Sequence, residues 1–207
     1  MKKNSENKIY IKNEKIFKNT FQMIIYTILF GIIIFAFIYI SKMDFNTKKE
    51  AKVELVELFD KLDHDNVYVY GNAVTIKNMV ENGTGIVLFG TNNEWVNYYA
   101  SFVNKAAKEV GIKEIYYYDF IKNKVDNNGT YESIVNKLEE YVIKNDRGFT
   151  NIYAPTLLVM KNGKVLLFDD ETSFMRAHEK PNDYWSYYKQ MVKISEFKEV
   201  FNRFIEG

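Results

Sequence analysis

The sequence predicts an α/β domain, with a central mixed sheet flanked by helices, preceded by one N-terminal transmembrane helix. Three observations lead to this prediction. An uncharged, strongly apolar segment occupies residues 21–40. After it, predicted strands and helices alternate, as in parallel strands joined by crossover helices. Two strands joined by an Asn-Gly turn then follow, which predicts an antiparallel hairpin beside the parallel strands.

The composition bounds the chemistry of the chain. It has 207 residues, of which 47% are hydrophobic and 27% charged, which is a globular composition. The absence of cysteine excludes disulfides, thiolate metal sites and thiol nucleophiles in this chain. The only two histidines, His64 and His178, are far apart and are expected at the surface, so no metal and no cofactor is predicted. Residues 41–207 carry 22 basic and 25 acidic residues, and this slight acidity argues against nucleic-acid binding.

The segment 21–40 is long enough to cross a membrane, because 20 residues of helix span about 30 Å. It exceeds the apolar core of a secretory signal, and no small-residue cleavage site follows it. We therefore expect an uncleaved signal anchor rather than a buried core helix. Residues 1–20 carry six lysines against two glutamates, which predicts a cytoplasmic, basic N-terminus. The expected localisation is the cell membrane, single-pass, with the domain extracytoplasmic.

The elements after the anchor follow from hydrophobic spacing. Residues 41–65 are expected to form a helical connector, with an amphipathic helix over 46–62. Residues 66–207 form the predicted domain. Alternating or continuous apolar runs predict strands, and apolar residues at helical spacing predict helices. The predicted order is strand 67–70, helix 74–81, strand 85–90, helix 94–110, strand 113–119, helix 131–144, strands 156–160 and 164–168, and helix 183–206 with a break near residues 194–195.

Three pieces of residues 67–207 carry a resemblance to a known family. The first is the buried strand 85–90, with its loop and long helix. The second is Ala154-Pro155-Thr156, followed by a strand and the Asn162-Gly163 turn, which resembles the cis-proline segment of thioredoxins. The third is the C-terminal helix. Residues 83–120 look particularly similar to membrane-anchored thioredoxin-like proteins of Firmicutes, of the bacteriocin-transport accessory type. The resemblance implies a thioredoxin-like fold.

The chain departs from that family at its redox motif. Redox-active members carry C-x-x-C where the first long helix begins, and the matching residues here contain no sulfur. Thiol–disulfide exchange needs a thiolate attacker, so the domain is expected to be redox-inactive and not an enzyme of that kind. The resemblance implies a peptide-binding groove at the degenerate motif and the cis-proline loop. Its candidate residues are Asn93, Glu94, Trp95, Val96, Ala154, Pro155 and Thr156.

The expected function is therefore a membrane-tethered, redox-inactive module that binds an extended peptide or another envelope protein, with an accessory role. The alternative is an enzyme with non-thiol chemistry in the same cleft, with Glu94 as general base. A third hypothesis makes the transmembrane helix the main contact, although Gly31 stands without a G-x-x-x-G partner. The sequence leaves open whether Trp95 is a core residue or a binding platform.

Two further patterns are interpreted as structural. Tyr116-Tyr117-Tyr118 and residues 184–188 (YWSYY) are expected to pack one side of a strand and of a helix into the core, with an exposed aromatic binding patch as the alternative. Asp169-Asp170-Glu171 lacks the spacing of a calcium loop and is expected to be a solvated loop.

Overall fold

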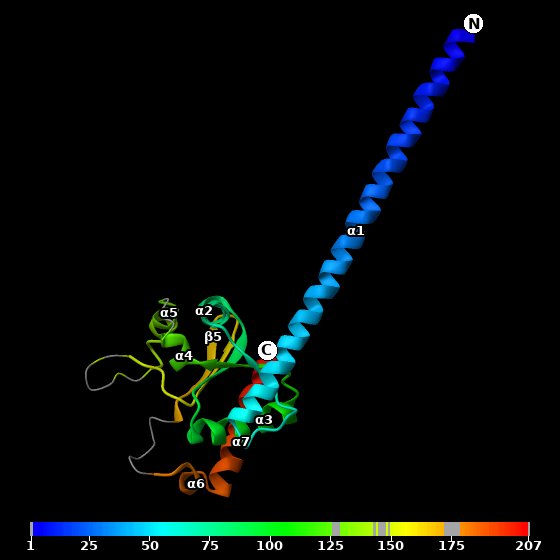
Figure 1. Cartoon of the computed structure of the whole chain (residues 1–207). Helices are drawn as coiled ribbons and strands as arrows, with labels where there is room; N and C mark the ends of the chain where they lie inside the picture. Colours follow the sequence, from blue (N-terminus) through cyan, green and yellow to red (C-terminus); the bar gives the residue numbers. More distant parts are fainter. Residues whose placement is uncertain are drawn as a thin grey trace. The chain divides into compact units, whose positions relative to one another are not determined.

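The computed structural model describes residues 2–125, 129–142, 144, 148, 150–171 and 179–206 (Figure 1). The chain divides into two compact units, Met1–Thr47 and Lys48–Gly207. The His178 prediction lies outside the described residues, whereas His64 is exposed as predicted.

Helix α1 runs from Lys2 to Leu58 and contains the apolar segment. Within it, Thr20–Met43 comprises 24 residues with a mean hydropathy of 2.7, and none of this segment is buried. The Thr27 hydroxyl donates to the Met23 carbonyl at 2.9 Å, and the Ser41 hydroxyl donates to the Phe37 carbonyl at 2.8 Å. These polar groups are thus satisfied within the helix, as an apolar solvent requires. The segment is long and apolar enough to be a membrane anchor or a signal sequence.

The second unit is built on a five-stranded mixed sheet in the order β1-β3-β2-β4-β5. Strands β1, β3 and β2 are parallel, β4 is antiparallel to β2, and β5 is antiparallel to β4. The predicted α/β class with a mixed sheet is confirmed. The strands are β1 Tyr68–Tyr70, β2 Gly85–Gly90, β3 Ile115–Asp119, β4 Thr156–Lys161 and β5 Lys164–Asp169.

Helices cover both faces of the sheet (Figure 1). Successive strand residues point to opposite faces, so Ile86 and Leu88 belong to one apolar cluster, and Val87 and Phe89 to the other. The first cluster includes residues of α3 (Glu94–Val110) and α7 (Tyr187–Glu206), together with Leu55 from the end of α1. The second includes residues of α2 (Ala73–Asn82) and α5 (Thr130–Lys137).

The connector contributes to the core. Leu55, Phe59 and Leu62 are buried in the first cluster. The predicted amphipathic helix 46–62 is part of α1 and ends at Leu58, after which Leu62 follows in a turn. The predicted helix therefore ends four residues early. Phe59 and Leu62, two of the apolar residues that predicted it, are nevertheless buried in the first cluster, just beyond the end of α1.

Other boundaries also differ from the prediction. Helix α5 ends at Lys137 rather than residue 144, because the chain continues as hydrogen-bonded turns to Val142. Residue 143 lies outside the described residues. Strand β3 begins at Ile115 rather than residue 113. The short helix α4 (Phe120–Val125) directly follows β3 and was not predicted.

The predicted break near residues 194–195 is wrong. Helix α7 is continuous through Ile194, whose side chain is buried in the first cluster, and Ser195, which is exposed. The break lies instead at Trp185–Ser186, between α7 and α6 (Pro181–Tyr184). There the Ser186 carbonyl accepts from the Gln190 amide at 3.0 Å, so Ser186 takes the helix-starting position.

Candidate functional site

The strand register brings distant segments to one end of the sheet. Strands β2 and β3 both finish there, at Gly90 and Asp119. Phe89 pairs with Thr156, which opens β4, and Leu157 pairs with Asp169, which closes β5. We call this end, where Gly90, Thr156 and Asp169 lie, the site end. It gathers the loop into α3, the Ala154–Pro155 bond and the acidic residues after β5.

The start of α3 is fixed by its own cap. The Asn93 side-chain oxygen accepts from the Val96 amide at 2.9 Å, which satisfies one of the free amides of the first helical turn. Val96 is completely buried. Glu94 is exposed, and its carboxylate forms no hydrogen bond or ion pair with any described residue. Asn93 thus caps the helix and Val96 is part of the core, while no described residue orients Glu94 as a general base would require.

Trp95 combines features of the two roles considered for it, a core residue and a binding platform. Its side chain is half-buried and packs on the margin of the first cluster. Its ring meets the Tyr184 ring edge-on, with 5.6 Å between centroids. Part of the indole is thus anchored by α6, and part remains available at the surface.

The loop before β4 has the predicted cis peptide bond, between Ala154 and Pro155. Pro155 and Thr156 are buried, and Ala154 is half-buried against the first cluster. The Thr156 hydroxyl donates to the Tyr153 carbonyl at 2.6 Å. Because Thr156 pairs with Phe89, this loop and the loop into α3 both lie at the site end.

The acidic residues after β5 are not the solvated loop that the sequence suggested. Asp170 and Glu171 are each only 8% exposed. Glu171 is covered by Tyr184 of α6 and Lys193 of α7, an arrangement that local sequence does not reveal. Among residues 184–188, Trp185 is buried, while Tyr187 and Tyr188 are exposed.

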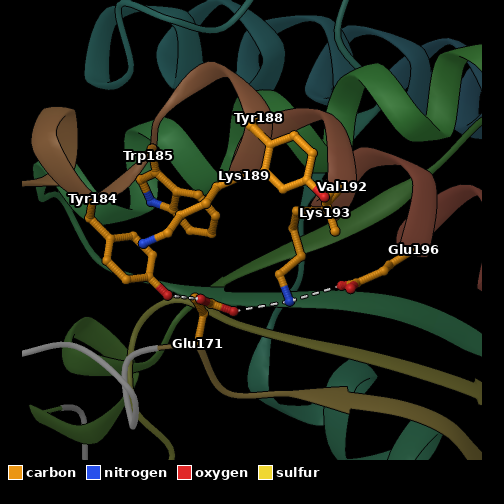
Figure 2. A pocket seen from close by; sticks show the side chains of 8 residues that line it. All are labelled: Glu171, Tyr184, Trp185, Tyr188, Lys189, Val192, Lys193 and Glu196. Atoms are coloured by element: carbon orange, nitrogen blue, oxygen red, sulfur yellow. Dashed lines mark hydrogen bonds and ion pairs between the residues drawn. The ribbon is translucent and has the colours of Figure 1, made fainter.

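A largely buried ion-pair network joins these segments, and Figure 2 shows its members Glu171, Lys193 and Glu196. The Lys193 ammonium on α7 lies 3.1 Å from an Asp169 carboxylate oxygen, 3.0 Å from Glu171 and 3.3 Å from Glu196. The Tyr99 hydroxyl on α3 donates to Asp169, and the Tyr184 hydroxyl on α6 donates to Glu171. Four elements therefore meet at two carboxylates.

The surroundings favour a charged lysine and neutral tyrosines. Burial alone would lower the pKa of Lys193, but the Asp169 and Glu171 carboxylates outweigh it and hold that pKa above the ordinary value. Burial, followed by the charge of Asp169, raises the pKa of Tyr99. Burial and the hydrogen bond to Glu171 raise the pKa of Tyr184. The network thus pairs one ammonium with three carboxylates and keeps both phenols as donors.

A cavity of about 220 Å³ opens beside this network (Figure 2). Its walls come from the end of β5, α6 and the first turns of α7. The Lys189 ammonium lies 3.6 Å from the centroid of the Tyr184 ring. The lining residues are Glu171, Tyr184, Trp185, Tyr188, Lys189, Val192, Lys193 and Glu196.

One sequence signal could have revealed the network. Lys193 lies four residues before Phe197 and seven before Val200, both buried, so helical spacing puts this lysine on the core side of α7. A lysine on that face needs a carboxylate partner. The run of three acidic residues directly after an apolar strand is a candidate for that partner.

Comparison of the chain with protein-family models, with curated proteins and with solved structures found no match.

Proposed function

We propose that this chain is a membrane-tethered, thioredoxin-like domain without thiols, and that it binds an extended peptide segment of a partner protein at the site end. The apolar segment of α1 would be a single-pass anchor, with the lysine-rich N-terminus in the cytoplasm and the domain outside. The lysine excess before the segment supports that orientation.

The likeness to thioredoxin is supported by topology. Three parallel strands, β1, β3 and β2, are followed by the antiparallel strands β4 and β5 in the order β1-β3-β2-β4-β5. The cis Ala154–Pro155 bond directly precedes β4. The sequence resemblance and the strand order both support the same arrangement.

The observation that carries the proposed binding is that Trp95 and the Pro155 loop lie at the same end of the sheet. An extended peptide can pair with exposed backbone near such a loop, while its side chains contact neighbouring residues. The half-buried Trp95 offers apolar area already held in place by Tyr184, so little side-chain entropy is lost on binding. Among the described residues no side chain orients Glu94, so the proposal favours binding over the enzymatic alternative.

Trp95→Ala tests the proposal in the full-length protein, held in lipid nanodiscs and exposed to an immobilised library of random heptapeptides. An aromatic anchor at the centre of an interface contributes on the order of 2 kcal/mol, so we expect about a thirtyfold loss of bound peptide. Tyr141→Ala is the matched control. Tyr141 is also a partly exposed aromatic residue packed on one ring, that of Phe168, but it belongs to the opposite face of the sheet.

Thermal unfolding of both variants completes the experiment. A binding role predicts that Trp95→Ala stays folded and loses peptide, while Tyr141→Ala keeps it. Loss of ~3–5 kcal/mol of stability would instead identify Trp95 as a core residue. Failure of the wild-type protein to retain any peptide, or equal retention by the Trp95 variant, would overturn the proposal.

A further inference from the structure

The cavity beside the ion-pair network has walls suited to a cation. Three aromatic side chains, Tyr184, Trp185 and Tyr188, stand around it together with the carboxylates of Glu171 and Glu196 (Figure 2). The face of an aromatic ring carries negative electrostatic potential, and an ammonium or guanidinium group within about 6 Å of its centroid is attracted to it.

The chain already places a cation there. Lys189 projects from the first turn of α7, and its ammonium lies over the face of the Tyr184 ring. Apart from this ring contact, the ammonium has no hydrogen-bond or ion-pair partner among the described residues. Lys189 is exposed and its side chain is flexible, so it can turn away into solvent. Its position shows that the aromatic wall accepts an alkylammonium group.

The charge balance favours a second cation over an anion. Lys193 lies between Asp169 and Glu171, and the three side chains are 15%, 15% and 11% exposed, respectively. Its single positive charge neutralises only part of the charge of the two carboxylates. Glu196 adds a further carboxylate at 3.3 Å from the same ammonium. Once Lys189 has turned into solvent, Lys193 alone faces these three carboxylates. An incoming anion would then meet net negative charge, whereas an incoming cation would be attracted by it.

We infer that this cavity is a subsite for the side chain of a lysine or arginine residue in the bound peptide, and that Lys189 occupies it in the free protein. The inference rests on the proposed peptide binding. The cavity, at about 220 Å³, is smaller than the roughly 300–1,000 Å³ of sites for whole small ligands, which suits one side chain. Trp95 contacts Tyr184, so the subsite adjoins the proposed peptide path.

The test uses the full-length protein in nanodiscs and four heptapeptide libraries whose central residue is fixed as Lys, Arg, norleucine or Glu. Norleucine matches the lysine stem without its charge. We expect the Lys and Arg libraries to be retained about tenfold better than the norleucine library, and the Glu library least. Lys189→Met should increase retention of the Lys library, because it removes the internal competitor.

Variants at Tyr184 separate the ring from its hydroxyl. Tyr184→Leu should abolish the preference for Lys over norleucine, whereas Tyr184→Phe keeps the ring and should keep the preference. Equal retention of the Lys and norleucine libraries by the wild-type protein would overturn the subsite while leaving peptide binding intact. Retention of none of the libraries would overturn the peptide-binding function itself.

Discussion

The two ends of the sheet are held together by different kinds of interaction. The end opposite the site end, which we call the turn end, is the hairpin between β4 and β5. Asn162 and Gly163 there adopt φ angles of 51° and 73°, and the Gly163 amide donates to the Gly83 carbonyl at 2.8 Å. The site end depends instead on the Lys193 ion pairs, which join residues 24 and 22 positions apart in sequence. Turn conformation and hydrogen bonds to backbone carbonyls shape the turn end, whereas ion pairs between side chains join the segments of the site end.

High pH should give the largest effect and should separate the two ends. The pKa values of Lys193, Tyr99 and Tyr184 are all raised at the site end, so their stabilisation is complete below the unfolded values, near 10, and is lost as the pH rises through the folded values. Burial likewise raises the pKa of Tyr118, in the core, to about 12. Above pH 10 we expect amide hydrogen exchange to accelerate first around Asp169 and Tyr184. Earlier acceleration around Asn162 would contradict this order.

Lys193→Met should destabilise the domain by about 3–5 kcal/mol, because it leaves the poorly exposed carboxylates of Asp169 and Glu171 without their cation. Urea unfolding at pH 7 measures the change. Lys198→Met is the matched control on the same helix. The ion pair of Lys198 with Glu109 is solvated, with side chains 42% and 41% exposed, so its loss should change stability far less. Equal effects of the two variants would show that the network at the site end contributes no more than a surface pair.

Gly90→Ala should cost about 1–3 kcal/mol by crowding the site end. A Cβ at Gly90 would lie 2.5 Å from Cε2 of Tyr117 and 3.1 Å from Cγ1 of Val96. Because the cause is lack of space, the double variant Gly90→Ala with Tyr117→Leu should lose less stability than the two single changes added together. Strict additivity in thermal unfolding would rule out the steric explanation.

Gly163→Ala should cost about 1–2 kcal/mol at the turn end for a different reason. A Cβ there would meet nothing closer than Cα of Asn82 at 3.6 Å, so space is sufficient, but φ is +73°. Gly163→Asn should cost less than Gly163→Ala, since asparagine tolerates the left-handed region. Equal losses for the two substitutions would show that backbone conformation is not the limiting factor.

Sequence reasoning succeeded where one segment carries its own signal. The Asn162-Gly163 hairpin, the buried strand 85–90 and the long helix 94–110 were all predicted, because turn residues and apolar spacing are local signals. It failed for Asp170 and Glu171, which are buried. The cover over Glu171 comes from Tyr184 of α6 and Lys193 of α7, which lie later in the sequence.

Topology was enough to predict that the candidate site residues lie at the same end of the sheet. It was not enough to predict the cavity beside them. Trp95 and Pro155 lie at the site end because strand order brings their loops there. The cavity is formed by Tyr184, Tyr188 and Lys193, and it requires the helix break at Ser186, which apolar spacing placed about nine residues too late.

Helix α7 is fastened at both ends of the sheet. Near its start, Lys193 is bound to Asp169 and Glu171, and near its finish, the Phe204 carbonyl accepts from the Lys161 ammonium at 2.6 Å. Between them, Ile194, Phe197 and Phe201 are buried. The part of the helix between these two contacts cannot fray progressively, so it should detach and reattach as one cooperative unit, with its amides exchanging at a single common rate.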